Sequence, residues 1–164
     1  MPKLIVTLFS LIILGACTAT TGSAPSVMGV GCTKPNNGIA VREQNATGAR
    51  IYYVDGSLLR YRDACGAQIY AYDGVKLRNY NFSGSAIYHF DGNAVRSFNA
   101  TGARVIYFDG QTLRASVRSG AALYYFDGRT LRHRDRGGAV IAYFDRPVER
   151  WVAIAVLTEK GMMP

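Results

Sequence analysis

The stretch Val105-Ile-Tyr-Phe-Asp-Gly110 belongs to a pattern that occurs six times at intervals of 18 residues and decides the fold. In each copy apolar or aromatic residues precede an Asp, which Gly follows in every copy except the last. A fixed period indicates one supersecondary unit repeated in tandem, and such units bury their apolar faces by stacking on one another. The copies are Ile51–Gly56, Ile69–Gly74, Ile87–Gly92, Val105–Gly110, Leu123–Gly128 and Ile141–Arg146.

Each unit contains two turn signals, if positions are counted from Ile51. The first is Asp-Gly at positions 5 and 6, and the second covers positions 13 to 16, as in Asn99-Ala-Thr-Gly102. The runs between them are four to five residues long and rich in Ile, Tyr, Phe, Leu and Arg, so each unit predicts a β-hairpin. Calcium binding is the alternative role for the Asp row, but each Asp lacks the acidic neighbours of a calcium site.

A degenerate copy from Asn37 to Gly48 extends the register backwards, so we expect about seven units with imperfect ends, or about fourteen strands. Strand twist accumulates in a sheet of that size, which must curl, split or close. The predicted class is therefore all-β, with tandem β-hairpin repeats in a curled or closed antiparallel meander. The segment Trp151–Leu157 predicts a closing strand or a partner-binding edge, and no segment after residue 16 predicts a helix.

Positions 2, 4 and 9 fall on one side of the predicted sheet and carry Tyr, Phe and Leu, so this side is the expected core. Positions 3 and 10 fall on the other side. We interpret them as a structural lattice of ion pairs and cation–π contacts; the alternative is a basic, aromatic stripe that binds anionic or sugar surfaces. The residues of this candidate row are Arg60, Arg78, Arg96, Arg114, Arg132, Tyr53, Tyr107, Tyr125 and Tyr143.

The N-terminus has Lys3, an apolar run from Leu4 to Leu14, and then Gly15-Ala16-Cys17. A short positive segment followed by an apolar run of this length is typical of a secretory signal. Leu14-Gly15-Ala16-Cys17 resembles the lipobox of bacterial lipoproteins. This resemblance implies cleavage before Cys17 and lipidation of that cysteine, and Thr18 in place of Asp implies an outer-membrane destination. An ordinary signal peptide with an incidental cysteine is the alternative.

These features divide the chain into a signal peptide (1–16), a lipidated Cys with a flexible tether (17–36), a repeat domain (37–157) and a C-terminal tail (158–164). Cys32 and Cys65 would meet an oxidising compartment after export, so we expect them to form a disulfide. We expect no metal site, because no Cys-x-x-Cys spacing occurs.

The unit Tyr-x-Phe-Asp-Gly-x-x-Leu-Arg, repeated over residues 37 to about 152, resembles the hairpins of bacterial four-fold beta-flower proteins, and more distantly YD-type repeats and choline-binding cell-wall repeats. The beta-flower family has no established activity, so this resemblance implies a shape and not a function. Seven copies also differ from a four-fold count.

No catalytic constellation recurs, since His89 and His133 occupy different positions of the unit, and we expect neither an enzyme nor a cofactor. The net charge of +8 favours anionic partners. The expected function is a non-enzymatic lipoprotein scaffold on the periplasmic face of the outer membrane; the alternative is a cell-wall or glycan-binding module that uses the Tyr/Arg face. The expected partners are the membrane through the lipid, with peptidoglycan, lipopolysaccharide or another envelope protein, and not nucleic acid.

Overall fold

The computed structural model describes residues 37–164. The predicted signal peptide, the tether, Cys17 and Cys32 lie outside the described residues. The described part is all-β apart from one helix, α1 (Arg150–Glu159). Its strands are β1 (Ile39–Arg42), β2 (Arg50–Asp55), β3 (Leu58–Tyr61), β4 (Gln68–Tyr72), β5 (Lys76–Asn79), β6 (Ala86–Asp91), β7 (Ala94–Ser97), β8 (Arg104–Asp109), β9 (Thr112–Ala115), β10 (Ala122–Phe126), β11 (Thr130–His133) and β12 (Val140–Phe144).

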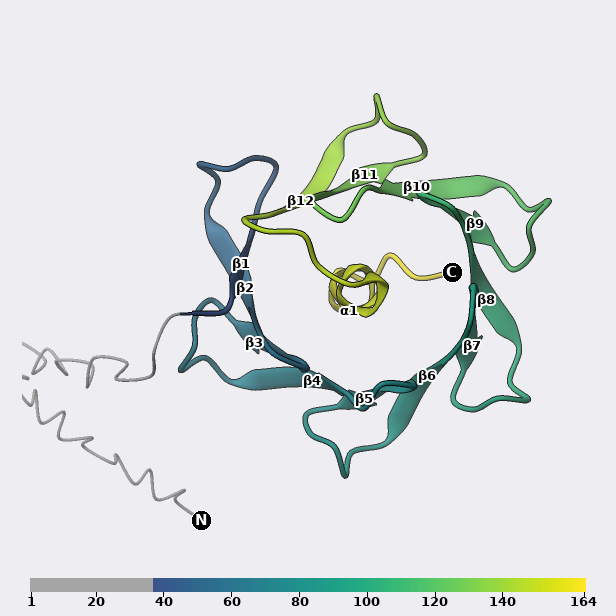
Figure 1. Cartoon of the computed structure of the whole chain (residues 1–164), viewed down its shortest axis with the longest axis horizontal. Coiled ribbons are helices and arrows are strands. Elements are labelled where there is room, and N and C mark those ends of the chain that lie inside the picture. Colours follow the sequence, from purple (N-terminus) through teal and green to yellow (C-terminus); the bar gives the residue numbers. More distant parts are fainter. Residues whose placement is uncertain (1–36) are drawn as a thin grey trace, which may run out of the picture. The chain divides into compact units, whose positions relative to one another are not determined.

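The strands form one closed antiparallel barrel in which neighbours in sequence are neighbours in the sheet (Figure 1). Closure comes from β1 and β12, which pair with Val41 opposite Phe144 and Arg42 opposite Tyr143. This register is the one found inside each repeat, where Leu59 faces Val54. The predicted class, a meander of tandem hairpins, is confirmed.

The expected number of units was wrong. There are 12 strands and not about fourteen, because the degenerate first copy supplies only β1 and the last copy supplies only β12. These two half units, from opposite ends of the domain, combine into a sixth hairpin that has no covalent turn. We call it the split hairpin, and the other five the covalent hairpins.

Positions 2, 4 and 9 face the interior, as predicted. The five position-9 side chains of the covalent hairpins and Val41, their counterpart in β1, are fully buried. Phe108, Phe126 and Phe144 at position 4 are also buried. The two faces are not strictly separate, since Tyr53 at position 3 is only 2% exposed. Its hydroxyl accepts a hydrogen bond from the backbone N–H of Gly38, which covers it from the outer side.

The interior of the barrel is filled by α1, which Figure 1 shows end-on at the centre of the ring. All residues from Trp151 to Leu157 are buried, so this helix is apolar on every side, as expected for a helix surrounded by protein. The prediction of a closing strand at Trp151–Leu157 was wrong, as was the expectation of no helix. Thr158 and Glu159 belong to the same helix, and Met162 and Met163 pack against the core.

The closed sheet explains why this segment is helical although Trp, Val and Ile favour strands. Every buried backbone N–H and C=O needs a partner. The strand that the segment would have paired with, β1, is already paired with β2 and β12. A helix satisfies its backbone groups internally, so it can fill an interior that has no free sheet edge.

The turns follow from two kinds of backbone requirement. In the Asp-Gly turns, Gly56, Gly92 and Gly110 have φ of 59° to 63°, a conformation that glycine adopts without steric cost. In the outer turns, which join one unit to the next, the position-16 glycine is needed for space. A Cβ atom on Gly84 would lie 1.8 Å from the carbonyl oxygen of Asn79, and the other units show the same approach.

Candidate functional site

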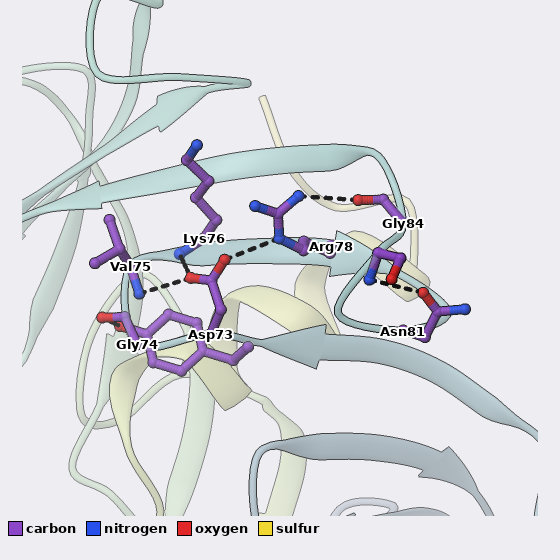
Figure 2. A network of polar contacts seen from close by, with 9 residues as sticks. Asp73, Gly74, Val75, Lys76, Arg78, Asn81 and Gly84 are labelled. Carbon is purple, nitrogen blue, oxygen red and sulfur yellow. Dashed lines mark hydrogen bonds and ion pairs between the residues drawn. The ribbon is translucent and has the colours of Figure 1, made fainter.

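The position-10 arginines lie on the outer face of the barrel, each opposite the position-3 residue of its own unit. Each arginine makes two contacts. Its Nε reaches a carboxylate at position 5, except in Arg132, and its Nη1 donates to the carbonyl oxygen of the position-16 glycine. Figure 2 shows this arrangement for Arg78, whose Nε lies 2.8 Å from Asp73 Oδ2 and whose Nη1 lies 3.0 Å from the Gly84 oxygen.

The same bridge occurs around the ring, so the repeated arginine connects the two turns of its unit. Ion pairs join Arg60 to Asp55 (3.3 Å), Arg78 to Asp73 (2.8 Å), Arg96 to Asp91 (3.2 Å), Arg114 to Asp109 (2.9 Å) and Arg42 to Asp145 (2.8 Å). The arginine side chains in these pairs are only 13–30% exposed. The row therefore presents little free positive charge to solvent.

Arg132 departs from the pattern, because a hydroxyl stands between it and its carboxylate. Its Nε donates to Thr130 Oγ1 at 3.3 Å, and that hydroxyl donates to Asp127 Oδ2 at 2.9 Å. The Nη1 contact with the Gly138 oxygen is kept at 3.1 Å. The connection between the two turns is thus preserved through a relay.

The four tyrosines of the candidate row differ in exposure. Tyr53 is buried, whereas Tyr107, Tyr125 and Tyr143 are half-buried on three successive units. Tyr125 donates to Gln111 Oε1 at 2.6 Å. Within residues 37–164, the cation–π contact of the structure joins Arg150 to Phe108 at 4.9 Å, outside the row. The tyrosines and arginines of the row are therefore cross-strand neighbours and not stacked pairs.

Two of the turn carboxylates have a lowered pKa. Burial opposes ionisation of Asp73, but hydrogen bonds from Arg78 and from the backbone N–H groups of Lys76 and Val75 outweigh it and lower the pKa. The pKa of Asp127 is lowered in the same way, because the Thr130 and Arg129 N–H groups and the Thr130 hydroxyl outweigh burial. Both carboxylates therefore act as anionic caps of their turns.

Glu159, at the C-terminal end of α1, accepts hydrogen bonds from the hydroxyls of Tyr61 and Tyr70. The Tyr70 oxygen lies 3.1 Å from Glu159 Oε2. Burial, followed by the charge of Glu159, raises the pKa of Tyr52 to about 12. These contacts tie the last turn of the helix to the barrel wall.

Shallow clefts lie beside both ends of α1. At its start, Glu149, Arg150 and Trp151 line a cleft of about 360 Å³ together with Tyr72 and Phe90. Trp151 stacks on Tyr72 with ring centroids 5.4 Å apart, so the indole is held by packing. At the other end, a cleft of about 300 Å³ includes His133 and Lys160.

We find no constellation for catalysis or metal binding in the described part of the chain. There, no three His, Cys, Asp or Glu side chains gather to hold a metal ion. His89 and His133 belong to different hairpins.

Cys65 is disulfide-bonded, and the two cysteines that could be its partner, Cys17 and Cys32, lie outside the described residues. The helix within 37–164, α1, does not have the length and apolar character needed to cross a membrane.

Sequence reasoning missed the residues that close the ring. The 18-residue period places Arg150 at position 10 of the last copy, but Arg150 begins α1 and contacts Asn93 and Phe108. The true counterpart of Asp145 is Arg42, whose Nε and Nη2 both donate to that carboxylate. One signal was available: Arg146 replaces the turn glycine, and its Nη2 donates to the carbonyl oxygens of Asn37 and Gly38 at 2.6 and 2.7 Å.

Comparison with known proteins gives no family for this chain. No protein-family model, curated protein or solved structure matches it. Its function is therefore inferred from the residues and geometry described above.

Proposed function

We propose that this chain is a non-enzymatic lipoprotein of the bacterial envelope, anchored to the outer membrane and serving as a structural or interaction scaffold in the periplasm. The observation that carries the scaffold proposal is the use of the repeated polar residues. The arginines and aspartates join the two turns of each unit, as in the Asp73–Arg78–Gly84 bridge. A rigid ring built in this way provides a platform and leaves no repeated charge for catalysis.

The lipoprotein proposal is supported by Leu14-Gly15-Ala16-Cys17, which follows an apolar run and precedes Pro- and Gly-containing sequence. The test is Cys17→Ala in the full chain, followed by labelling with radioactive palmitate and separation of inner and outer membranes. We expect wild type to carry label and to sediment with the outer membrane. The variant should lose the label and accumulate as the uncleaved precursor. A labelled variant, or an unlabelled wild type, would contradict the proposal.

A glycan-binding module is the second candidate, favoured by the half-buried Tyr107, Tyr125 and Tyr143 on adjacent units. Aromatic faces next to polar groups suit sugar rings. The discriminating measurement is co-sedimentation with insoluble peptidoglycan and binding to lipopolysaccharide. Loss of binding in Tyr125→Ala, with an unchanged melting temperature, would favour this candidate over the scaffold. Binding that Tyr125→Ala leaves unaltered, or no binding, would favour the scaffold.

A further inference from the structure

Exposed aromatic side chains gather on the outer turns of three consecutive units. Tyr80 is 69% exposed, Phe82 54%, Phe98 66% and Tyr61 45%. They lie at or beside the turns between β3 and β4, β5 and β6, and β7 and β8. We call these four residues the aromatic turn surface. Large aromatic side chains on adjacent exposed turns are unusual for a surface that meets only water.

Tyr61 also holds α1 through Glu159, but the fold does not require aromatic residues at the positions of Tyr80 and Phe98. Tyr80 and Phe98 occupy position 12, where all six units have a positive φ between 51° and 60°. The other units place Gln44, Arg62, Ser116 or Arg134 there with the same backbone. A bulky side chain is disfavoured in this conformation. Tyr80 and Phe98 are exposed and add nothing to the core.

The aromatic turn surface occupies one side of the ring. The turns that carry it follow one another along β3 to β8 in Figure 1, while the units across the ring, built from β10 and β11 and from β12 and β1, lie opposite. The corresponding turns of those opposite units carry Glu43, Gln44, Arg134 and Arg136, which are polar and exposed. The third turn on that side, between β9 and β10, carries Val117, which is 44% exposed, so the two sides differ in their exposed aromatic residues and not in all apolar ones.

A second observation indicates what meets this side. Cys65 lies in the first of the three aromatic-bearing turns and is disulfide-bonded. Both possible partner cysteines belong to residues 1–36, the segment that carries the apolar run and Cys17. If Cys17 is lipidated, the partner is Cys32, and the 14 residues between them span at most about 50 Å. The segment that would carry the lipid is then attached to the domain at the first of the aromatic-bearing turns.

We propose that the aromatic turn surface docks on the phospholipid surface that the Cys17 lipid enters. This inference rests on the proposed lipoprotein function and adds an orientation to it. Tyr and Phe rings suit the interface between headgroups and acyl chains. The aromatic turn surface alone would bind the membrane weakly. A lipid anchor raises its effective concentration there, so this weak binding is enough to set the orientation of the ring.

The experiment uses the full, anchored chain reconstituted into phosphatidylethanolamine–phosphatidylglycerol vesicles whose acyl chains carry bromine, which quenches tryptophan at short range. Phe98→Trp places the probe on the aromatic turn surface. The matched control, Gln44→Trp, places it at the same repeat position in the opposite unit. Arg134→Trp is a second control if Gln44→Trp does not fold. Trp151 is 4% exposed and lies in α1 inside the barrel, so it contributes the same background to every variant.

We expect a several-fold greater loss of emission for Phe98→Trp than for Gln44→Trp. Equal quenching of the two probes, or no quenching of either, would overturn the proposal. A change in the emission of Phe98→Trp that depends on protein concentration and not on vesicles would also overturn it, because a second copy would then cover the surface. Lipidation is read separately, from the mass of the N-terminal peptide, so an unlipidated chain and an undocked ring give different results.

Discussion

The five covalent hairpins and the split hairpin use the same register, and all of them except the hairpin of Arg132 use the same ion pair, but they differ in how their strands are brought together. In a covalent hairpin, Asp91 and Arg96 are five residues apart and a two-residue turn holds them. In the split hairpin, Arg42 and Asp145 are separated by 103 residues. Bringing distant segments together costs more chain entropy than closing a short turn. Local turns therefore form the covalent hairpins, whereas contacts between distant segments must close the ring.

The split hairpin has additional contacts that the covalent hairpins lack. Arg146 donates to the oxygens of Asn37 and Gly38, and Gly38 donates to the Tyr53 hydroxyl. These bonds fasten the start of the domain to its last repeat. They substitute for the missing turn, so breaking this region should cost more than the same change elsewhere.

The largest expected effect comes from Phe144→Ala compared with Phe126→Ala. Both side chains occupy position 4, and each loses the same edge-to-face contact between the two rings, which are 5.9 Å apart. Truncation of a buried Phe costs about 3–5 kcal/mol. We expect Phe144→Ala to exceed Phe126→Ala in urea unfolding because it also loosens the β1–β12 pairing. Equal losses would show that closure is not a weak point.

A smaller difference is expected between Arg42→Ala and Arg96→Ala. Each removes one ion pair and one bond to a glycine carbonyl oxygen, and Arg42→Ala also removes the second bond to Asp145, from Nη2. Arg42→Ala should lower the melting temperature more, because no turn keeps its strands together. Neither change should alter binding to anionic lipid or peptidoglycan. A melting curve of Arg96→Ala that overlays wild type would show that the arginine bridge does not stabilise the covalent hairpins.

Acid should weaken the covalent hairpins that contain Asp73 and Asp127. The pKa of each carboxylate is lowered in the folded protein. Their stabilisation is therefore fully present above the ordinary Asp pKa of about 3.9 and is lost as the pH falls through the lower folded value. Melting temperatures measured through this range should fall more steeply for wild type than for Asp73→Asn/Asp127→Asn. Parallel curves would contradict this assignment.

The smallest effect should be the same in both kinds of hairpin. Gln44→Gly and Ser116→Gly each replace a side chain at positive φ, 55° and 51° respectively. Each change removes the strain of a side chain in the left-handed conformation, but Gly also raises the entropy of the unfolded chain. The net result should be a stabilisation of each variant by about 0.5–1 kcal/mol. Thermal unfolding checks this. A gain in only one variant would show that closure strains the backbone.

Much of the fold could be predicted because it depends on local patterns. The 18-residue period, the Asp-Gly turns and the period-two facing predicted hairpins with positions 2, 4 and 9 inside, and Leu59, Leu77 and Leu113 are fully buried. Positions 3 and 10 were predicted to share the outer side, and there Tyr107 lies opposite Arg114. The second partner of each arginine, the glycine carbonyl, could not be predicted, because it depends on the path of the outer turn.

The sequence by itself determined that this domain consists of repeated hairpins with one apolar face, because each unit contains its own turn and alternation signals. Only the tertiary structure decided that two half units pair and that Trp151–Leu157 becomes a helix. Local preference in that segment favours a strand. Once β1 pairs with β12, however, the barrel interior offers apolar walls and no free edge, so the buried backbone must satisfy its own hydrogen bonds. The helix is therefore a consequence of closure.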